Sequence, residues 1–347
     1  MMGLTVDVCG VKHPHARGHI AALNSLEAVE RIRIWDSDLV AAEQVTSQTQ
    51  KAVAHSGLWE DLLADAASTV ACVFLPSREN GPQALKALLA GKHVYSDKPG
   101  ALDSSQMGEI VTAVEKTGKQ FCCSYPWRVD PIALEIRSLI CQGILGEIWS
   151  LEAKWLTSQV ALRGPSSPLF SKGASGGGIL TWLGCHWMDL LRFIQGAEVT
   201  AVSAMVATQC REGIDVEDVA SVSLRFSNGA IGTLRAGYVL TPFTGYDPDD
   251  ISFSFEGSLG SLSWHPQAMP GYRLRSSHPS LHRASHRTVE MEYKREGTGY
   301  FPEYLKAFLD SALSGSPPPS NALDALRVLQ VLEAIYRSAE QKREVEI

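Results

Sequence analysis

The chain has 347 residues, of which 45% are hydrophobic and 20% charged, and its formal net charge is −7. Such a composition is typical of a globular protein, and the length predicts about two domains. The sequence has no long basic run, which argues against general nucleic-acid binding, and no apolar run that approaches the roughly 20 residues needed to span a bilayer. The first residues lack a basic segment followed by a long apolar one, so we expect no secretory signal.

The first third of the chain alternates short apolar strands with helices. Pro82 is expected as the first residue of a helix that Gly91 ends, and Asp103 is expected to cap a helix that ends at Gly118. Short runs that are apolar throughout are typical of strands covered on both faces. The strands are predicted at Thr5–Cys9, Arg31–Trp35, Val70–Leu75, His93–Ser96 and Gln120–Ser124. This alternation predicts an N-terminal α/β domain, a doubly wound parallel sheet of the Rossmann type.

The pattern changes near residue 125, where longer strands with hairpin signals begin. Asn228-Gly229 is a strong signal for a tight turn between two strands. Pro270, Gly271 and Pro279 favour a loop around the histidines at 278, 282 and 286. We expect this loop to be mobile or to face a partner, with metal binding as the less favoured alternative. The later strands are predicted at Ser150–Leu156, Val199–Thr208, Val219–Phe226, Ala230–Val239, Ile251–Phe255 and Gly260–Trp264, and the last helices at Pro302–Leu313 and Asn321–Lys342. We therefore predict a Rossmann domain over residues 1–125 and an α+β domain with a large open, mainly antiparallel sheet over 126–347.

The seven cysteines are scattered and form no pair of Cys-x-x-Cys motifs. Several lie in apolar runs, so we expect buried free thiols and a cytoplasmic location. They are Cys9, Cys72, Cys122, Cys123, Cys141, Cys185 and Cys210.

A dinucleotide-binding layout is present at the N-terminus, although its glycine turn is degenerate. Gly10 ends the first strand, and Asp36 ends the second strand 26 residues later. An acid in that position accepts hydrogen bonds from the adenosine ribose and repels a 2′-phosphate, so NAD is favoured over NADP. Lys12 and His15 lie near positions that glycine usually holds, and the histidines His13, His15 and His19 fall within seven residues. We expect them to contact phosphate or substrate and assign no metal ion, with a metal site as the less favoured alternative.

Several motifs in order resemble one family. Ala90–Pro99 reads AGKHVYSDKP, Gly176–Asp189 reads GGGILTWLGCHWMD, and Tyr125–Arg128 and Val216–Ala220 read YPWR and VEDVA. These segments resemble the Gfo/Idh/MocA oxidoreductases. The resemblance implies an NAD-dependent oxidoreductase that acts on a secondary alcohol or ketone of a sugar, inositol or derivative. It also implies a homodimer or homotetramer formed through the open sheet face, and the charge and hydropathy given above predict no nucleic-acid or membrane partner.

The resemblance assigns Lys98 as the acid/base and His186 as its relay or hydrogen-bonding partner, with a cis peptide bond expected before Pro99. The family's acid four residues before the histidine is Trp182 here, which would instead stack on a sugar ring. The residues assigned to the cofactor are Gly10, Val11, Lys12, His13, Pro14, His15, Asp36, Leu75, Pro76, Ser77, Asn80, Asp97, Lys98, Trp127 and Arg128. Those assigned to the substrate are Lys98, Arg128, Arg163, Trp182, His186 and Asp189.

The sequence is also compatible with two other functions. One is a sugar lyase or glycosidase that oxidises a carbon transiently and recycles its NAD. The other is a non-catalytic ligand sensor that keeps the nucleotide fold, for which the replacement of the usual acid by Trp182 is the main argument.

Overall fold

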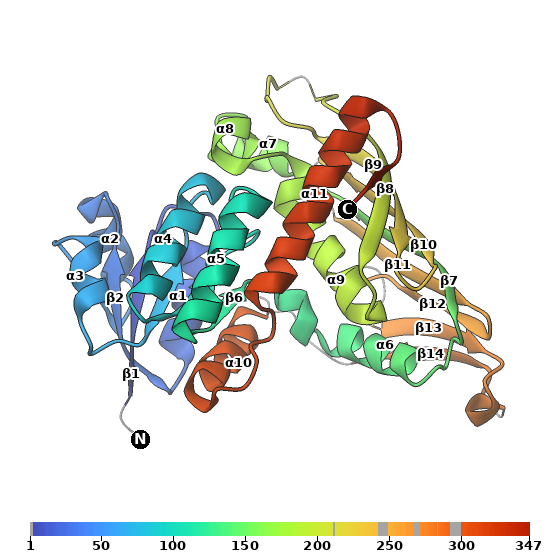
Figure 1. Ribbon diagram of the computed structural model, residues 1–347, viewed down its shortest axis with the longest axis horizontal. Coiled ribbons are helices and arrows are strands. Elements are labelled where there is room, and N and C mark those ends of the chain that lie inside the picture. The colour runs from blue at the N-terminus through green and yellow to red at the C-terminus, as the bar shows by residue number, and fades with distance from the viewer. Residues whose placement is uncertain (1–2, 211, 242–248, 267–270, 283, 292–299) are drawn as a thin grey trace. The chain divides into compact units, whose positions relative to one another are not determined.

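The computed structural model describes residues 3–347 except 211, 242–248, 267–270, 283 and 292–299. Contacts within the chain divide it into two compact units (Figure 1). The first unit comprises residues 1–129 and 295–327, and the second comprises residues 130–294 and 328–347. The predicted division at residue 125 assigned residues 295–327 to the second domain, whereas their contacts belong to the first unit. The predicted domain ranges stay a prediction.

The first unit is built on a six-stranded sheet in the order β3-β2-β1-β4-β5-β6, in which all neighbours are parallel. This is the strand order of dinucleotide-binding Rossmann domains, so the predicted fold is confirmed. The five predicted strands are present, and the short strand β3 was not predicted. The bounds are β1 Leu4–Cys9, β2 Val29–Trp35, β3 Ala52–Ala54, β4 Val70–Val73, β5 His93–Ser96 and β6 Phe121–Cys123.

Helices connect these strands, and one predicted helix start is wrong. The helix that contains Pro82 begins at Ser77, so this proline lies inside it. The helix can start earlier because the carbonyl of Pro76 accepts hydrogen bonds from Glu79 and Asn80. The predicted ends at Gly91 and Gly118 and the cap at Asp103 are confirmed. The bounds are α1 Ala16–Ser25, α2 Leu39–Thr46, α3 Trp59–Ala64, α4 Ser77–Leu89 and α5 Ser104–Thr117.

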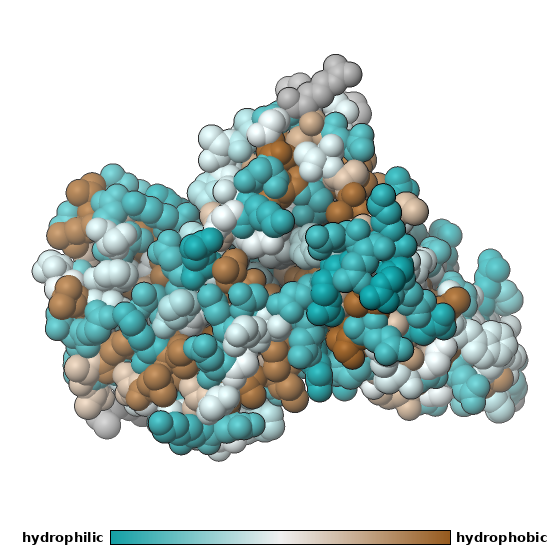
Figure 2. All heavy atoms as spheres, turned by 45° about the horizontal axis from the view of Figure 1, so that its top comes forward, coloured by the Kyte–Doolittle hydropathy of each residue, from teal (hydrophilic) through white to brown (hydrophobic). Residues whose placement is uncertain are grey.

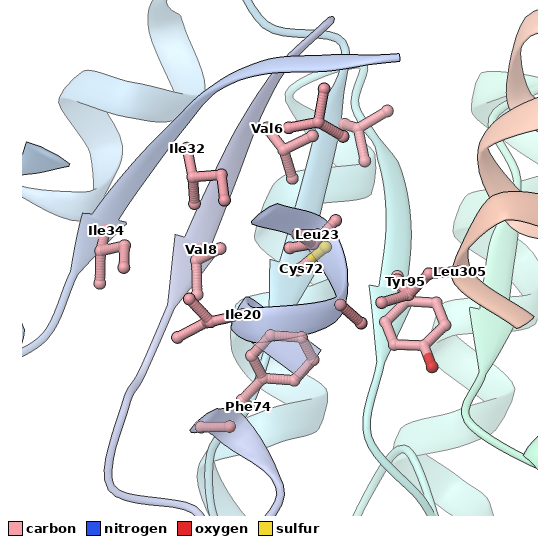
Figure 3. Close-up of a cluster of buried hydrophobic side chains, with 14 of the residues drawn as sticks. Val6, Val8, Ile20, Leu23, Ile32, Ile34, Cys72, Phe74, Tyr95 and Leu305 are labelled. Carbon is pink, nitrogen blue, oxygen red and sulfur yellow. The ribbon is translucent and has the colours of Figure 1, made fainter. Parts of the chain in front are cut away.

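A late helix completes the core of this unit. Helix α10 (Phe301–Ser314) contributes Tyr304, Leu305 and two further residues to the same buried cluster as β1, β2 and α1. Figure 3 shows Leu305 beside Tyr95 of β5, with Ile20 and Leu23 of α1 over the strands. The apolar face of α10 is therefore buried in the Rossmann unit.

The second unit contains a nine-stranded sheet in the order β14-β13-β12-β11-β7-β10-β9-β8-β15. Only β7 and β10 pair in parallel, so the predicted mainly antiparallel sheet is confirmed. The predicted turn between β9 and β10 is present, with Gly229 at a φ of +88°. The bounds are β7 Ile148–Leu156, β8 Val199–Ala207, β9 Val219–Phe226, β10 Ile231–Gly237, β11 Asp250–Gly257, β12 Gly260–Trp264, β13 Gly271–Ser276, β14 His286–Glu290 and β15 Val345–Glu346.

The loop predicted around residues 271–287 is wrong in part, because β13 and β14 pair as antiparallel strands there. Tyr272 and Leu274 are buried and alternate with the exposed Arg273 and Arg275. This alternation is a strand signal that the arginines and the flanking breakers obscured. A short 3₁₀ turn (Pro279–Leu281) connects the two strands.

Helices cover one face of this sheet and leave the other open. Along β9, Val222 and Leu224 are buried, whereas Ser221, Ser223 and Arg225 are exposed. The helices of this unit are α6 Pro131–Cys141, α7 Gln159–Arg163, α8 Lys172–Ser175, α9 Cys185–Gln195 and the greater part of α11 Ala322–Gln341. In the part of the chain that is described, no helix is both long and apolar enough to cross a membrane. Figure 2 shows apolar residues interspersed among hydrophilic ones on the face in view.

Candidate functional site

The turn after β1 requires glycine at its first position. Gly10 has a φ of +94°, and a Cβ there would lie 2.6 Å from Cδ2 of Leu75 and 2.7 Å from the carbonyl oxygen of Phe74. Only a residue without a side chain fits this conformation and this space. Gly10 and Leu75 therefore bring the ends of β1 and β4 together, at the edge of a parallel sheet where ligands bind.

Asp36 lies at the end of β2 and contacts the same turn. Its Oδ2 accepts a hydrogen bond of 2.9 Å from the backbone N–H of Val11, and its Oδ1 accepts one from that of Asp38. Asp38 caps α2 and forms an exposed ion pair with Lys12, whose Nζ lies 2.9 Å from the carboxylate. The sheet thus holds a buried carboxylate next to the glycine turn.

Asn80 links three segments at this edge. Its Oδ1 accepts from the N–H of Leu75, and its Nδ2 donates to Oγ of Ser96 and to the carbonyls of Asp97 and Gly100. The side chain is 2% exposed. Asn80 therefore positions the turn that contains Pro76 and Ser77, and its predicted contact with the cofactor stays a prediction.

Three histidines surround the carboxylate of Asp97, which follows β5. Oδ2 of Asp97 lies 2.9 Å from Nδ1 of His13, 3.1 Å from Nδ1 of His15 and 3.6 Å from Nε2 of His19. Burial lowers the pKa of His15 to about 4 and lowers that of His19 as well. Burial alone would raise the pKa of Asp97, but His15 and His13 hold it well below its usual value. Pro14 separates the first two histidines at the start of α1.

Lys98 is the next residue and is 3% exposed. Lysines are almost never buried to this degree unless a partner or a function requires it. Its backbone N–H donates to Oδ1 of Asp97 at 2.7 Å, and the peptide bond to Pro99 is cis, as expected. The buried loop at the end of β5 therefore fixes the main chain of Lys98.

Trp127 and Arg128 lie in a 3₁₀ turn (Pro126–Val129) after β6. The guanidinium of Arg128 donates to the carbonyl of Pro319 at 3.0 Å and pairs with Asp324 at 3.0 Å. The indole of Trp127 lies edge-on to the ring of Tyr300. These contacts give Arg128 a structural role, and its predicted contact with cofactor or substrate stays a prediction.

In the second unit, a π-helical turn, η3 (Leu180–Gly184), leads directly into α9. The N–H of Cys185 donates to the carbonyl of Leu180, which is the i to i−5 bond of a π-helix. Such turns occur often at functional sites. Trp182 therefore lies on a wider turn than the α-helical spacing predicts, whereas His186 and Asp189 lie on α9 as expected.

Glu217 holds the start of this turn and was not predicted as a site residue. Its Oε2 accepts from the N–H of Gly178 at 2.9 Å, and its Oε1 accepts from the N–H of Leu180 at 3.0 Å and from the hydroxyl of Tyr336 at 2.9 Å. Burial raises the pKa of Glu217. A Cβ on Gly178 would lie 1.9 Å from the carbonyl oxygen of Glu217, which explains the glycine at this position. The glutamate of the VEDVA motif (Val216–Ala220) was the feature of the sequence that could have indicated this role.

The predicted substrate residues of this unit are buried except for Arg163. Trp182, His186 and Asp189 are 5%, 7% and 1% exposed. The guanidinium carbon of Arg163 lies 5.6 Å from the ring centroid of Trp182, within the range of a cation–π contact. The ring of His186 lies 6.2 Å from that of Trp155. The unit thus combines an aromatic face, a cation and an imidazole, which together suit a polar ligand with apolar ring faces.

Two family models match the chain. Residues 4–125 match an oxidoreductase family with an NAD-binding Rossmann fold, and residues 133–263 match the GFO/IDH/MocA C-terminal domain. The first matched range contains the glycine turn, Asp36 and Lys98, and the second contains Glu217 and the π-helical turn.

Similar proteins are oxidoreductases. An uncharacterized oxidoreductase of Synechocystis sp. is 28% identical over 235 residues, which cover 65% of this chain and 63% of that protein. The levoglucosan dehydrogenase of Pseudarthrobacter phenanthrenivorans is 24% identical over 83% of this chain and 82% of its own length. A solved structure of levoglucosan dehydrogenase in complex with NADH and L-sorbose has a TM-score of 0.89 at 21% identity and covers 100% of this chain and 99% of that one. At that identity, the structural likeness shows the fold alone.

Proposed function

Because this chain belongs to the Gfo/Idh/MocA family of NAD-binding oxidoreductases, we propose that it transfers hydride between NAD(H) and a secondary alcohol or ketone of a sugar, polyol or derivative. The observation that carries this proposal is Lys98, a lysine 3% exposed, in a loop at the carboxyl edge of a parallel sheet. Its neighbour Asp97 holds its backbone by a hydrogen bond of 2.7 Å. The names of the similar dehydrogenases support a small carbohydrate as substrate.

The turn after β1 and the end of β2 fit a dinucleotide. Gly10 has no room for a side chain, so its backbone can approach a ligand closely, and Asp36 keeps acceptor capacity beyond its two backbone hydrogen bonds. We propose that the Asp36 carboxylate accepts from the ribose hydroxyls and thereby favours NAD over NADP. The nicotinamide, when bound, supplies the hydride acceptor or donor.

Lys98 is the proposed acid/base. In the oxidative direction its Nζ takes the hydroxyl proton while the carbinol carbon loses a hydride to the nicotinamide. The C–O single bond becomes the C=O double bond of a ketone. In the reverse direction the protonated amine returns that proton. His186 is the proposed hydrogen-bonding partner of the substrate, and Trp182 is proposed to stack on the C–H face of a sugar ring.

The first experiment asks whether the purified protein retains nucleotide and whether it turns over. A panel of polyols and keto-sugars is followed by NADH absorbance in the near ultraviolet. Lys98→Ala is expected to lower kcat by about 10²–10⁴-fold, the usual contribution of a general acid/base, while NAD binding persists. Full activity of this variant would refute the assignment of Lys98.

Lys92 provides a matched control. It is also 3% exposed, but its Nζ donates to the carbonyls of Asp65 and Ser68, each at 2.6 Å. Lys92→Ala is expected to lower stability without a specific loss of kcat. An equal loss of kcat in both variants would mean that any buried lysine here supports the fold and that Lys98 has no special role.

The same panel tests the other two functions. A stoichiometric rise in NADH counts against a lyase that recycles its cofactor. Tight NAD binding without turnover on any substrate would favour the ligand sensor, for which Trp182 in place of an acid is the supporting observation.

The proposal includes a homodimer or homotetramer formed through the open sheet face and a cytoplasmic location. That face has short side chains such as Ser221 and Ser223, and Met205 and Ile231 on neighbouring strands are 81% and 54% exposed. Light scattering is expected to give the mass of an oligomer. Met205→Glu combined with Ile231→Glu is expected to reduce it to that of the monomer, and an unchanged mass would place the contact elsewhere.

A further inference from the structure

We propose that His13, His15, His19 and Asp97 form a binding site for a divalent transition-metal ion, with Zn²⁺ as the best fit. These four side chains belong to the first unit and are separate from the proton transfer assigned to Lys98. The sequence alone favoured a phosphate or substrate contact for these histidines, and the arrangement of their nitrogens favours a metal ion.

The distances from the Asp97 carboxylate to the three histidines are close to the donor separations around a tetrahedral ion. Zn²⁺ binds histidine nitrogen and carboxylate oxygen at about 2.0–2.2 Å, so adjacent donors in a tetrahedron lie about 3.3–3.6 Å apart. The distances from Oδ2 of Asp97 to the three histidine nitrogens are 2.9, 3.1 and 3.6 Å. The ligand atoms of His13, His15 and Asp97 all lie within 4.8 Å of one another. Three of the four ligands therefore already lie together, and the fourth, His19, whose Nε2 is 3.6 Å from Oδ2 of Asp97, would move toward them to complete a tetrahedron.

His19 is the independent observation that points to a ligand. It is completely buried, and neither ring nitrogen has a hydrogen-bond partner among the described residues. The centroid of its ring lies 4.6 Å from that of Phe74, on which it stacks, and 3.9 Å from that of Phe301. These two rings cover the apolar faces of the imidazole, and its Nε2 lies 3.6 Å from Oδ2 of Asp97. A buried polar atom without a partner is unfavourable. Coordination would satisfy Nε2.

The local fold brings these residues together. His15 is the N-cap of α1, and His19 follows four residues later on the same face of that helix. His13 precedes the helix in the turn after β1, and Asp97 follows β5, the second strand along the sheet from β1. The other carboxylate oxygen of Asp97 accepts the backbone N–H of Lys98. Hydrogen bonding of a ligating carboxylate in this way is typical of metal sites.

Nitrogen and carboxylate donors together suit Zn²⁺, Co²⁺, Ni²⁺ or Fe²⁺ better than Mg²⁺ or Ca²⁺, which prefer oxygen ligands. The alternative is a closed hydrogen-bond network, in which the histidines bond the Asp97 carboxylate and Nδ1 of His13 accepts the backbone N–H of His15. In that case His15 can bond either carboxylate oxygen, at 3.1 and 3.3 Å, whereas His19 stays without a hydrogen bond among the described residues. The two possibilities differ in whether metal binds with a defined stoichiometry.

The test uses the full chain without a polyhistidine tag, stripped with a chelator and then titrated with Zn²⁺ in competition with an indicator. We expect one Zn²⁺ per chain, a higher melting temperature with Zn²⁺, and with Co²⁺ the intense visible absorption of a tetrahedral site. His15→Ala and Asp97→Asn are each expected to weaken binding by at least about 100-fold, the upper end of what loss of an outer-shell partner costs. His15 is the safer variant, since its side chain is 23% exposed.

The histidines at 278, 282 and 286 provide the matched control, because they also lie close together in sequence but are partly or fully exposed. Replacement of all three by alanine is expected to leave Zn²⁺ affinity unchanged. Circular dichroism without metal establishes that each variant folds. The proposal is overturned if the stripped protein binds no Zn²⁺ stoichiometrically, if Co²⁺ keeps the spectrum of the aqueous ion, if His15→Ala binds Zn²⁺ as tightly as the wild type, or if the control variant loses binding.

Discussion

Glu217 offers the sharpest test of how the second unit positions its site. Its carboxylate accepts hydrogen bonds from the N–H groups of Gly178 and Leu180 and from the hydroxyl of Tyr336. Glu217→Ala leaves these three buried donors without their acceptor. At about 1–3 kcal/mol for each unsatisfied group, and less where water enters, we expect a loss of roughly 3–6 kcal/mol in the free energy of unfolding.

Glu217→Gln separates charge from geometry. An amide oxygen in place of Oε1 keeps the bonds from Leu180 and Tyr336, whereas the amide NH₂ faces the N–H of Gly178 and loses that bond. We expect a cost of about 1–3 kcal/mol, offset in part because the burial that raises the pKa of Glu217 also makes its charge unfavourable. Tyr336→Phe keeps both backbone bonds and is expected to cost about 1 kcal/mol.

The assay is amide hydrogen exchange over residues 176–186, followed by mass spectrometry and compared with urea unfolding. Exchange in this peptide should accelerate in Glu217→Ala, less in Glu217→Gln, and little in Tyr336→Phe. Because the peptide contains Trp182 and His186, kcat should fall in the same order. Unchanged exchange in Glu217→Ala, or a larger effect from Tyr336→Phe, would refute the reasoning that this carboxylate holds the π-helical turn.

Three further predictions concern the cofactor turn and pH. Asp36→Asn is expected to lower the preference for NAD over NADP by about tenfold or more, measured from the two dissociation constants, since it removes the charge that repels a 2′-phosphate; an unchanged ratio would contradict this role. Gly10→Ala is expected to lower the free energy of unfolding by about 2–6 kcal/mol, from backbone strain and overpacking together. Gly91 is the control, because it has a φ of +83° but no atom within 4 Å of the position of a Cβ, so Gly91→Ala should cost only the backbone strain of about 1–3 kcal/mol. Equal losses in the two variants would argue against the contact with Leu75. The pKa of Glu217 in the folded state is raised above its ordinary value of 4.5, so the folded state binds this proton more readily than the unfolded state. The free energy of unfolding of the wild type relative to Glu217→Gln should therefore rise as pH falls from neutral toward 4.5. A fall in this difference would contradict the direction of the pKa shift.

Local patterns in the sequence predicted most of the first unit. Apolar runs such as Val70–Val73 and His93–Ser96 are covered on both faces, so their composition alone is a strand signal. Strand β3 was not predicted because Ala52–Ala54 is only three residues long and half-exposed, so it shows neither a periodic pattern nor an apolar run. Pro82 was misplaced because proline in the first turn is a common start signal, and only the observed hydrogen bonds to Pro76 show that the helix begins earlier.

What the sequence determined by itself is the order of elements, the Rossmann topology, the mainly antiparallel sheet and the identity of motifs such as the one that contains Lys98. These depend on side-chain periodicity and turn chemistry, which act between residues close in the chain. Only the tertiary structure decided that Glu217 caps the turn that contains Trp182, and that His13, His15 and His19 converge on Asp97. Those contacts join residues tens of positions apart, and their geometry depends on the packing of the strands and helices that lie between them, which no local pattern records.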